Sequence, residues 1–410
     1  MSAVKVLAVV MAGGAGSRLH PLTADRSKPA VPFGGRYRIV DFVLSNLINS
    51  GIHAIYLLVQ YKSQSLIEHV RKAWVMSPIT PLHFVTVVPP QMREGEHWFQ
   101  GTADAVYQNL SLIARHRPDI VAVFGADHVY RMDIQQMVAY HLERGADVTV
   151  SARPVHLGDC GAFGVIAADS GGRIRGFQEK PAKPAPMPND PARCFASMGN
   201  YLFNTPVLVE CLESGHRQRC TDFGRDIIPA LIQSHRVYAY DFTTNEIPGL
   251  KPYEEKGYWR DVGSVDAYYE AHRDLLGLEP RFDEFNTGWP IYTGNYLGPS
   301  ARIVGGLIEN SIISAGSVVN LARISNSIIR REVIIDKDVE IRDSVIMDYT
   351  VIGRGSRLRR AIVDRYNEIP PGTMIGHDPV QDARHYHVTA AGVTVMPKGR
   401  RGLGLDMVFE

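Results

Sequence analysis

Short runs of apolar residues alternate with amphipathic segments from the start of the chain to residue 276. The runs at 6–10, 54–60 and 119–125 are continuous and short, as is typical of buried strands. Between the first two runs, apolar residues recur every three or four positions from Val40 to Ile48, which predicts a helix. Strands that alternate with helical segments predict a layered α/β sheet, and ligands of such sheets bind beyond the carboxyl ends of the strands.

Polar residues mark the starts of several predicted helices. One helix is expected to start at Asp133, and Thr102 is a candidate cap for another. Ser65 and Glu68 have the spacing of a capping box. Ser264 is the better cap for the helix that follows "WRDVG".

A different period begins after a turn-rich linker at residues 277–296. From residue 297 to about residue 376, helical spacing disappears and apolar residues recur every five or six positions. Three apolar series stand out, each recurring at every seventeenth position: Ile324, Ile341, Leu358 and Ile375; Ile312, Ile329, Ile346 and Val363; Val318, Ile335, Ile352 and Ile369. Three apolar rows with one shared period predict a coil with three flat sides, of about four turns. A β-sandwich of short strands is the alternative.

The sequence therefore predicts two domains. Residues 1–276 are expected to form a Rossmann-like α/β domain with a mixed sheet, and residues 297–410 a left-handed parallel β-helix of the hexapeptide-repeat kind. The β-helix is expected to serve oligomerisation and regulation.

Composition narrows the choice of partners and compartment. The chain has 44 basic and 43 acidic residues, so it carries no global charge that would favour nucleic acid or an anionic membrane. No apolar run approaches the roughly 20 residues that span a bilayer. Cys160, Cys194, Cys211 and Cys220 show no Cys-x-x-Cys spacing, so neither a disulfide framework nor a cysteine metal site is expected, and a reducing, cytoplasmic compartment fits best.

The stretch "MAGGAGSRLHPLTADRSKPAVPFGG" follows the first predicted strand. Gly13, Gly14 and Gly16 can bring backbone amides close to phosphate oxygens. Arg18 offers a forked donor and Lys28 a point charge. The stretch matches neither the dinucleotide fingerprint nor the P-loop, and on these residues alone it could be an ordinary βα turn with two surface cations.

The extended segment "GGAGSRLHPLTADRSKPAVPFGGRYRIVDFVLSN" resembles the signature of the sugar-nucleotide pyrophosphorylases. Further segments agree with that family: "HWFQGTADAVYQN", "VFGADHVYRMD", "FGVIA", "FQEKPAKP", "ASMGNYLF" and "YWRDVGSVDAYYEA". Within the family, the chain is most similar to members that act on ATP and glucose 1-phosphate. The resemblance covers nearly the whole chain and implies an enzyme that supplies glycogen-type α-glucan synthesis.

The resemblance implies a role for each matching residue. The ATP phosphates are expected at Gly13, Gly14, Gly16, Arg18 and Lys28, and the adenosine at Gly101 and Phe99, where Phe99 replaces a Tyr of some members. Glucose 1-phosphate is expected at Gly164, Glu179, Lys180 and Ser197, and Mg²⁺ at Asp127 and Asp261. Arg18, Lys28 and Asp127 are expected to carry catalysis. His128 is expected either to be structural or to support the residues that touch the substrates.

These roles suit the chemistry. A phosphate monoester has a second pKa of about 6 and is mostly dianionic at neutral pH, so it needs no general base. The difficulty is to bring two anions together and to neutralise the transferring group, which cations and positioning achieve. A carboxylate pair suits Mg²⁺, an ion that prefers oxygen ligands.

Regulation and oligomerisation are expected from the same resemblance. Related enzymes are usually homotetramers that respond to sugar phosphates and nucleotides. Arg38, Arg357, Arg359 and Arg360 could bind such an anionic effector between the domains, or they could be solvated surface charges.

Three alternatives stay open on the sequence. The nucleotide could be UTP or dTTP, because base choice depends on a few loop contacts. The β-helix could carry acyl transfer, although no inserted loop with a catalytic His is evident. A non-catalytic regulatory subunit would keep the fold, but Asp127, Lys180 and Asp261 are all present.

Overall fold

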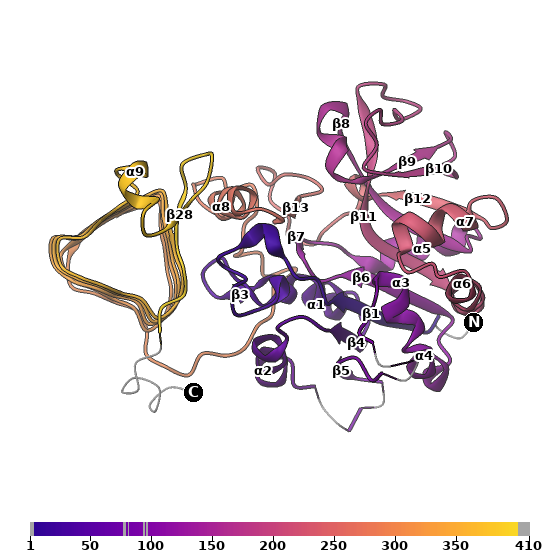
Figure 1. Cartoon of the computed structure of the whole chain (residues 1–410), viewed down its shortest axis with the longest axis horizontal. Coiled ribbons are helices and arrows are strands. Elements are labelled where there is room, and N and C mark those ends of the chain that lie inside the picture. Colours follow the sequence, from indigo (N-terminus) through magenta and orange to yellow (C-terminus); the bar gives the residue numbers. More distant parts are fainter. Residues whose placement is uncertain (1–3, 77–78, 81, 93–94, 96, 401–410) are drawn as a thin grey trace.

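The computed structural model of the chain describes residues 4–400, apart from 77–78, 81, 93–94 and 96. A mixed α/β part occupies one side of the molecule and a triangular β-helix the other (Figure 1). Both predicted architectures are therefore confirmed. None of the helices in these described ranges is long and apolar enough to cross a bilayer.

The central sheet has nine strands and combines parallel with antiparallel pairs. The strand order is β10-β9-β11-β6-β1-β4-β5, and β8 joins β11 to β12. The strands are β1 (Val6–Ala12), β4 (Ala54–Val59), β5 (Phe84–Val88), β6 (Ile120–Gly125), β8 (Val148–His156), β9 (Gly164–Ala168), β10 (Ile174–Glu179), β11 (Arg193–Asn204) and β12 (Val237–Asp241). Strands β1, β4, β5 and β6 run parallel, whereas β11 is antiparallel to β6.

Both faces of this sheet are buried, so its central strands read as continuous apolar runs. In β1, Leu7 and Val9 pack in one core while Ala8 and Val10 pack in the core on the other face. The covering helices are α1 (Ile39–Asn49), α2 (Gln64–Ala73), α3 (Thr102–Tyr107), α4 (Leu110–His116), α5 (Ile134–Glu143), α6 (Thr205–Arg217) and α7 (Ile228–Leu231). Helix α8 (Val265–Arg273) packs instead in the core shared with the β-helix.

The helix caps confirm part of the predicted pattern. The side chains of Asp133 and Ser264 accept backbone N–H groups at the starts of α5 and α8. The capping box at Ser65 is wrong: α2 has no side-chain cap, and the Ser65 hydroxyl accepts a hydrogen bond from Arg38 instead (2.9 Å). Gly101, rather than Thr102, stands at the cap position of α3.

The β-helix consists of three sheets whose stacked strands are parallel, and one of them ends in the antiparallel strand β28 (His387–Val388). Its strands lie between β14 (Arg302–Ile303) and β29 (Thr394–Met396), and two of the sheets hold five strands each, one more than the four turns predicted. The predicted period is confirmed for Ile324, Ile341, Leu358 and Ile375, which stack in register inside the coil.

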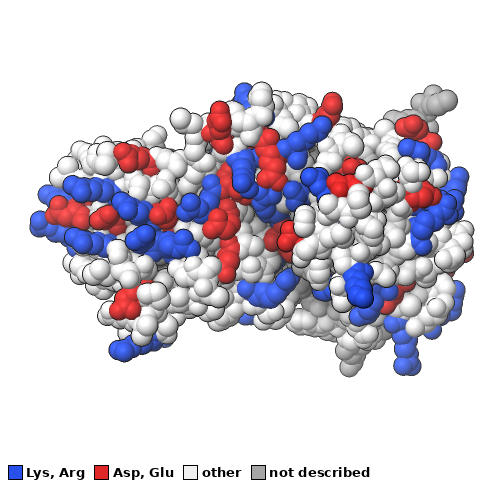
Figure 2. All heavy atoms as spheres, turned by 90° about the horizontal axis from the view of Figure 1, so that it is seen from above, with Lys and Arg blue, Asp and Glu red and all other residues white. Residues whose placement is uncertain are grey.

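The first coil is one residue shorter than the predicted period. Ile312 pairs with Ile328 rather than Ile329, and Val318 pairs with Ile334 rather than Ile335. The pattern of apolar positions cannot reveal this, because both members of each candidate pair are apolar. Outside the coil, basic and acidic side chains lie in mixed rows (Figure 2).

Buried arginines connect the β-helix to the α/β part. Arg330, only 1% exposed, donates two hydrogen bonds to the carbonyls of Phe33 (3.0 Å) and Gly34 (2.6 Å). Arg26 forms a buried ion pair with Asp364. Removal of one partner of such a buried ion pair costs about 3–5 kcal/mol, so the junction of the two parts is sensitive to substitution at these arginines.

One expectation about the cysteines is wrong. Cys160 and Cys194 form a disulfide, whereas Cys211 and Cys220 are free. The spacing of the cysteines does not predict this disulfide. The two bonded residues are 34 positions apart and meet only when β11 folds beside the turn that precedes β9. The cytoplasmic location stays a prediction.

Candidate active site

A cavity of about 770 Å³ opens at the carboxyl ends of β1, β4 and β6. It is the place that an α/β sheet of this type offers to ligands. The candidate site residues that line it are Gly13, Gly14, Gly16, Arg18, Lys28, Phe99, Gly101, Asp127, Gly164, Glu179, Lys180, Ser197 and Asp261. The structure thus brings together residues from 13 to 261 that the sequence predicts to share one site.

The glycine turn after β1 forms one wall of the cavity. Gly16 adopts a left-handed conformation (φ 61°), and a Cβ there would lie 2.9 Å from the Cβ of Lys28. Any larger residue would push the turn away from Lys28. Gly14 faces open space, with no heavy atom within 4 Å of where a Cβ would stand. The turn therefore leaves room for an anion beside its backbone amides.

Lys28 lies between two carboxylates. Its ammonium group is 3.0 Å from Asp127 and 3.0 Å from Asp261, and the Lys28 side chain is 7% exposed. Burial acts to lower the pKa of Lys28, but the two carboxylates raise it above its ordinary value, so the side chain stays charged. The pKa of Asp127 lies well below its usual range: burial acts against this shift, and the charges of His128 and Lys28 cause it.

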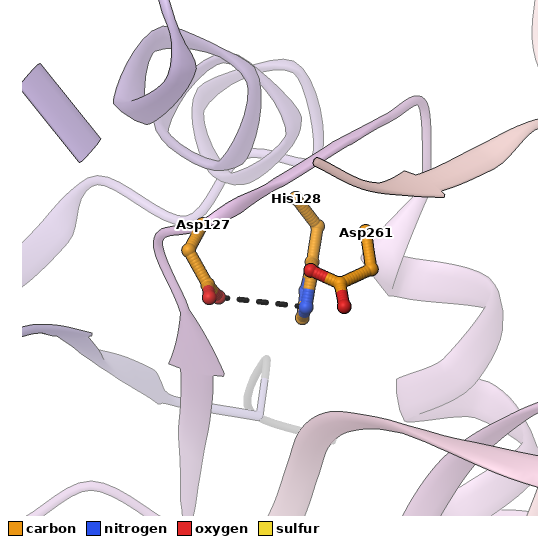
Figure 3. Close-up of side chains that lie close together, drawn as sticks. All are labelled: Asp127, His128 and Asp261. Carbon is orange, nitrogen blue, oxygen red and sulfur yellow. Dashed lines mark ion pairs between the residues drawn. The ribbon is translucent and has the colours of Figure 1, made fainter. Parts of the chain in front are cut away.

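Asp127, His128 and Asp261 form a group that suits a divalent cation. One ligand atom from each lies within 4.8 Å of the others, and Figure 3 shows the two carboxylates and the imidazole pointing into the same space. Strand pairing explains the arrangement, because β13 (Trp259–Asp261) pairs with β7 (His128–Tyr130) and sets Asp261 opposite His128. The Nδ1 atom of His128 is buried without a hydrogen-bond partner in the described part of the chain. The donor set fits a metal ion.

A second wall comes from β9, β10 and β11. Gly164 begins β9, and a Cβ there would lie 2.6 Å from the ring of Phe177. Glu179 ends β10, and Lys180 follows with a left-handed backbone (φ 48°) and donates its N–H to the Phe163 carbonyl (3.0 Å). Lys180 is exposed and its ammonium group is 3.5 Å from Glu179. A charged, accessible lysine at the rim is available to an incoming anion.

The third wall carries Phe99 and Gly101. The Gln60 side chain holds Phe99 through two hydrogen bonds: its Oε1 accepts from the Phe99 N–H (2.7 Å), and its Nε2 donates to the Phe99 carbonyl (3.2 Å). At Gly101 a Cβ would lie 2.3 Å from the carbonyl oxygen of Thr221. Glycine is required there by close packing against backbone.

Two residues of the site are not predicted from the sequence. Gln60 follows β4 directly, and this place at a strand's carboxyl end is a signal that could have found it. His128 is expected from the sequence to be structural or to support the site residues from behind, whereas in the structure its ring lies among the candidate metal ligands.

The candidate effector residues do not come together. Arg38 lines a second cavity of about 760 Å³ between α2, the linker and the β-helix. Arg357, Arg359 and Arg360 are not among the described residues that line it. Arg357 and Arg359 lie exposed on β24 (Arg357–Arg359), and Arg357 pairs with Glu340 on the neighbouring strand. Arg360 lies over the ring of Tyr269 and donates to the Ala391 carbonyl. The three arginines of the coil are therefore separate from the cavity.

Comparison with known proteins agrees with this geometry. Residues 7–277 match the Nucleotidyl transferase family, and residues 299–396 match the family described as GlmU-like, C-terminal hexapeptide. A glucose-1-phosphate adenylyltransferase of Thermodesulfovibrio yellowstonii is 56% identical, with 97% of each chain covered. Proteins of the same name from Anaeromyxobacter sp. and Corynebacterium jeikeium are 46% and 45% identical, with 96–99% of each chain covered. The chain belongs to the nucleotidyl transferases and, among them, to the glucose-1-phosphate adenylyltransferase family, whose other name is ADP-glucose pyrophosphorylase.

Proposed function

We propose that the chain transfers the adenylyl group of ATP to glucose 1-phosphate and releases diphosphate, with Mg²⁺ as its metal. The product, ADP-glucose, is a glucosyl donor for glycogen-type α-glucan synthesis. The observation that carries this proposal is the convergence of Arg18, Lys28 and Lys180 with Asp127 and Asp261 around one cavity. Relatives that are nearly half identical or more over almost the whole chain bear the name of this activity.

The reaction needs charge neutralisation more than proton transfer. A phosphate oxygen of glucose 1-phosphate forms a bond to the α-phosphorus of ATP, and the bond from that phosphorus to the bridging oxygen breaks, so that diphosphate leaves with the electron pair. We assign to Lys28 and Arg18 the neutralisation of negative charge on the ATP side. Lys180 is placed to bind the phosphate of the sugar.

Asp127 and Asp261 would hold the Mg²⁺, with His128 beside them. The ion would supply further neutralisation of the phosphate oxygens, which nucleotidyl transferases generally obtain from a divalent metal. The fixed pairing of β13 with β7 keeps the two carboxylates in place before substrates bind. Gln60 and Thr221 hold the Phe99–Gly101 segment, where we place the adenosine.

The direct test is an assay of diphosphate release from glucose 1-phosphate with ATP, UTP, GTP or dTTP, each with and without Mg²⁺. ATP should give most of the turnover, and removal of Mg²⁺ should abolish it. Dominant turnover of UTP or dTTP would assign a different nucleotide. Turnover of acetyl-CoA without diphosphate release would assign acyl transfer to the β-helix, and no turnover with any nucleotide would indicate a regulatory subunit.

We also propose that the second cavity binds an anionic effector, a sugar phosphate or a nucleotide. Its basic residues are Arg36, Arg38, Lys72, Arg330, Arg331, Arg365 and Lys398. Burial and the neighbouring Arg365 lower the pKa of Arg38 to about 9, and Arg365 has a buried Nε without a hydrogen-bond partner in the described structure. A bound phosphate would raise the pKa of Arg38 by its negative charge, and it would accept a hydrogen bond from the Nε of Arg365.

Two exposed arginines allow a matched test of this cavity. Arg36 lines it, whereas Arg359 lies on the coil away from it. Initial rates should be measured with fructose 1,6-bisphosphate, fructose 6-phosphate and AMP. Arg36→Ala should weaken the response to the active compound and Arg359→Ala should preserve it. If Arg359→Ala weakened the response and Arg36→Ala preserved it, the effector would bind on the coil instead of in the second cavity.

A homotetramer is part of the proposal. Ile303, Val304 and Leu307 are each more than half exposed at the first coil of the β-helix, which is unusual for aliphatic side chains that lie together. Sedimentation velocity on the purified chain measures the assembly directly, and a monomer would contradict this part.

A further inference from the structure

The disulfide between Cys160 and Cys194 lies beside the active-site cavity. Cys160 belongs to the short 3₁₀ turn Leu157–Ala162, and Cys194 belongs to β11. Both side chains are fully buried, and with Val165 they form a small separate core. The turn itself is exposed at Gly158, Asp159 and Gly161. A small local opening of this turn is enough to expose the sulfur atoms.

The bond encloses one half of the proposed site. Gly164, Glu179 and Lys180 lie inside the loop that it closes, and Ser197 lies three residues beyond Cys194. These four residues are the ones we assign to glucose 1-phosphate. The residues assigned to ATP, from Gly13 to Gly101, all lie outside the loop.

The hairpin of β9 and β10, which the bond encloses, is also held by noncovalent contacts at its ligand-bearing end. Strand β8 pairs with β11 as far as His156 and Arg193, just before the turn that carries Cys160, and Phe177 of β10 packs against the core that includes Phe223. Strand β10 is the edge of the sheet and pairs with β9, and β9 pairs with β11 through two residue pairs, one of which joins Val165 to Ala196. The opposite end of the hairpin, the turn between β9 and β10, is bound to β12. The Ala239 N–H donates to the Gly172 carbonyl (2.8 Å), and a β-bridge joins Arg173 to Tyr238. The disulfide thus adds a covalent link, next to these noncovalent contacts, between β11 and the end that carries Gly164 and Lys180.

We infer that the Cys160–Cys194 disulfide is a redox-sensitive positioning element for the sugar-phosphate half of the site, which rests on the proposed function. Reduction by a dithiol proceeds in balanced steps. A thiolate of the reductant attacks one sulfur atom, the Cys160–Cys194 bond breaks, and the released thiolate takes up a proton. The second thiol of the reductant then displaces the remaining cysteine, leaving two protein thiols and an oxidised, cyclic reductant.

Reduction should weaken sugar-phosphate binding selectively. Without the bond, the end of the hairpin must be ordered again each time glucose 1-phosphate binds. If binding must order roughly one additional backbone residue, the entropy cost weakens the binding of glucose 1-phosphate, and its KM should rise about fivefold or more. The KM for ATP should stay within about twofold, because the glycine turn and the Phe99 segment are outside the closed loop. If the disulfide only stabilised the fold, its reduction would change the KM values for glucose 1-phosphate and ATP equally, or would change neither.

The experiment compares the full-length enzyme before and after incubation with dithiothreitol, with alkylation and mass spectrometry to establish that Cys160 and Cys194 have been reduced. KM is measured for glucose 1-phosphate and for ATP. The Cys160→Ser/Cys194→Ser variant should resemble the reduced enzyme and ignore dithiothreitol. The Cys211→Ala/Cys220→Ala variant, which lacks the free cysteines, should respond as the wild type does.

A second readout is independent of turnover. Hydrogen exchange should accelerate on reduction in the segments around Gly164 and Lys180, and should stay unchanged in the segment from Gly13 to Lys28. An unchanged KM for glucose 1-phosphate together with unchanged exchange, in enzyme shown to be reduced, overturns the inference. If the enzyme releases no diphosphate from any nucleotide but the exchange responds as described, the positioning role stands and the proposed function fails.

Discussion

The buried His272 should make the stability of the protein fall as the pH drops below neutrality. His272 lies on α8 and is 1% exposed. Its Nδ1 donates to the carbonyl of Tyr268 (2.8 Å), and its Nε2 accepts from the N–H of Gly34 (3.2 Å). The bond from Gly34 requires a neutral ring, because a protonated Nε2 could no longer accept, whereas the bond to Tyr268 persists in either protonation state. Burial lowers the pKa of His272 to about 3, with the charge of Arg330 acting in the same direction.

The size of the effect follows from linkage. The folded state resists protonation down to about pH 3, whereas the unfolded chain takes up a proton near the ordinary value of 6.5. Below pH 6.5 the unfolded state therefore binds more protons, and the free energy of unfolding decreases as pH falls. Each pH unit in this window costs about 1.4 kcal/mol, so the loss between pH 7.5 and pH 5 is about 2 kcal/mol. The loss at pH 3 is about 4 kcal/mol.

Urea unfolding at pH 7.5 and at pH 5 measures this directly through tryptophan fluorescence. His272→Gln removes the titrating group, so its free energy of unfolding should change by about 2 kcal/mol less than that of the wild type between the two pH values. The exposed His385 provides the control, since His385→Gln should keep the wild-type pH dependence. If His272→Gln lost stability with acid as steeply as the wild type, the buried neutral imidazole could not be the cause.

Three substitutions in the cavity have distinct expected effects on steady-state diphosphate release. Asp127→Asn should lower kcat, because it removes charge that we assign to the metal, and full retention of kcat would exclude that role. Lys180→Ala should mainly raise KM for glucose 1-phosphate; an equal rise in KM for ATP would contradict its place in the sugar-phosphate half. Gly101→Ala places a Cβ 2.3 Å from the Thr221 carbonyl oxygen, so it should cost about 1–3 kcal/mol of stability and raise KM for ATP. If the Gly101→Ala variant kept the wild-type melting temperature and the wild-type KM for ATP, the backbone around residue 101 would be free to move and the close packing would not be required.

Sequence patterns predict the fold where one physical cause dominates. The central strands are buried on both faces, so their apolar runs are unambiguous, and the stacked rows of the β-helix repeat because each coil must fill the same interior. The short first coil escapes prediction, because Ile328 and Ile329 both satisfy the apolar pattern and only hydrogen bonding decides which one pairs with Ile312. The cap at Ser65 fails because α2 begins one residue earlier, at Gln64, so Ser65 lies inside the helix and its hydroxyl accepts from Arg38.

The site is predictable where residue type alone limits the chemistry. Glycine turns, paired carboxylates and lysines in a recognisable order suggest their ligands directly from the sequence. The contribution of His128 depends instead on strand pairing with Asp261, which lies in a distant part of the chain. The disulfide likewise depends on β11 returning beside the turn at Cys160. Contacts between distant segments therefore set the limit of what the sequence indicates.

One short segment joins the active site to the β-helix and to the second cavity. Lys28 reaches the carboxylates of the site, and a few positions later the carbonyls of Phe33 and Gly34 accept hydrogen bonds from Arg330 of the β-helix. Arg36, in the same segment, lines the second cavity. Because packed backbone of this kind has few alternative arrangements, an anion that displaces the backbone at Arg36 would also act on Lys28 or on the bonds to Arg330. Regulation through this segment would therefore appear in kcat and in the binding of ATP, which distinguishes it from the disulfide, whose effect is confined to the sugar phosphate.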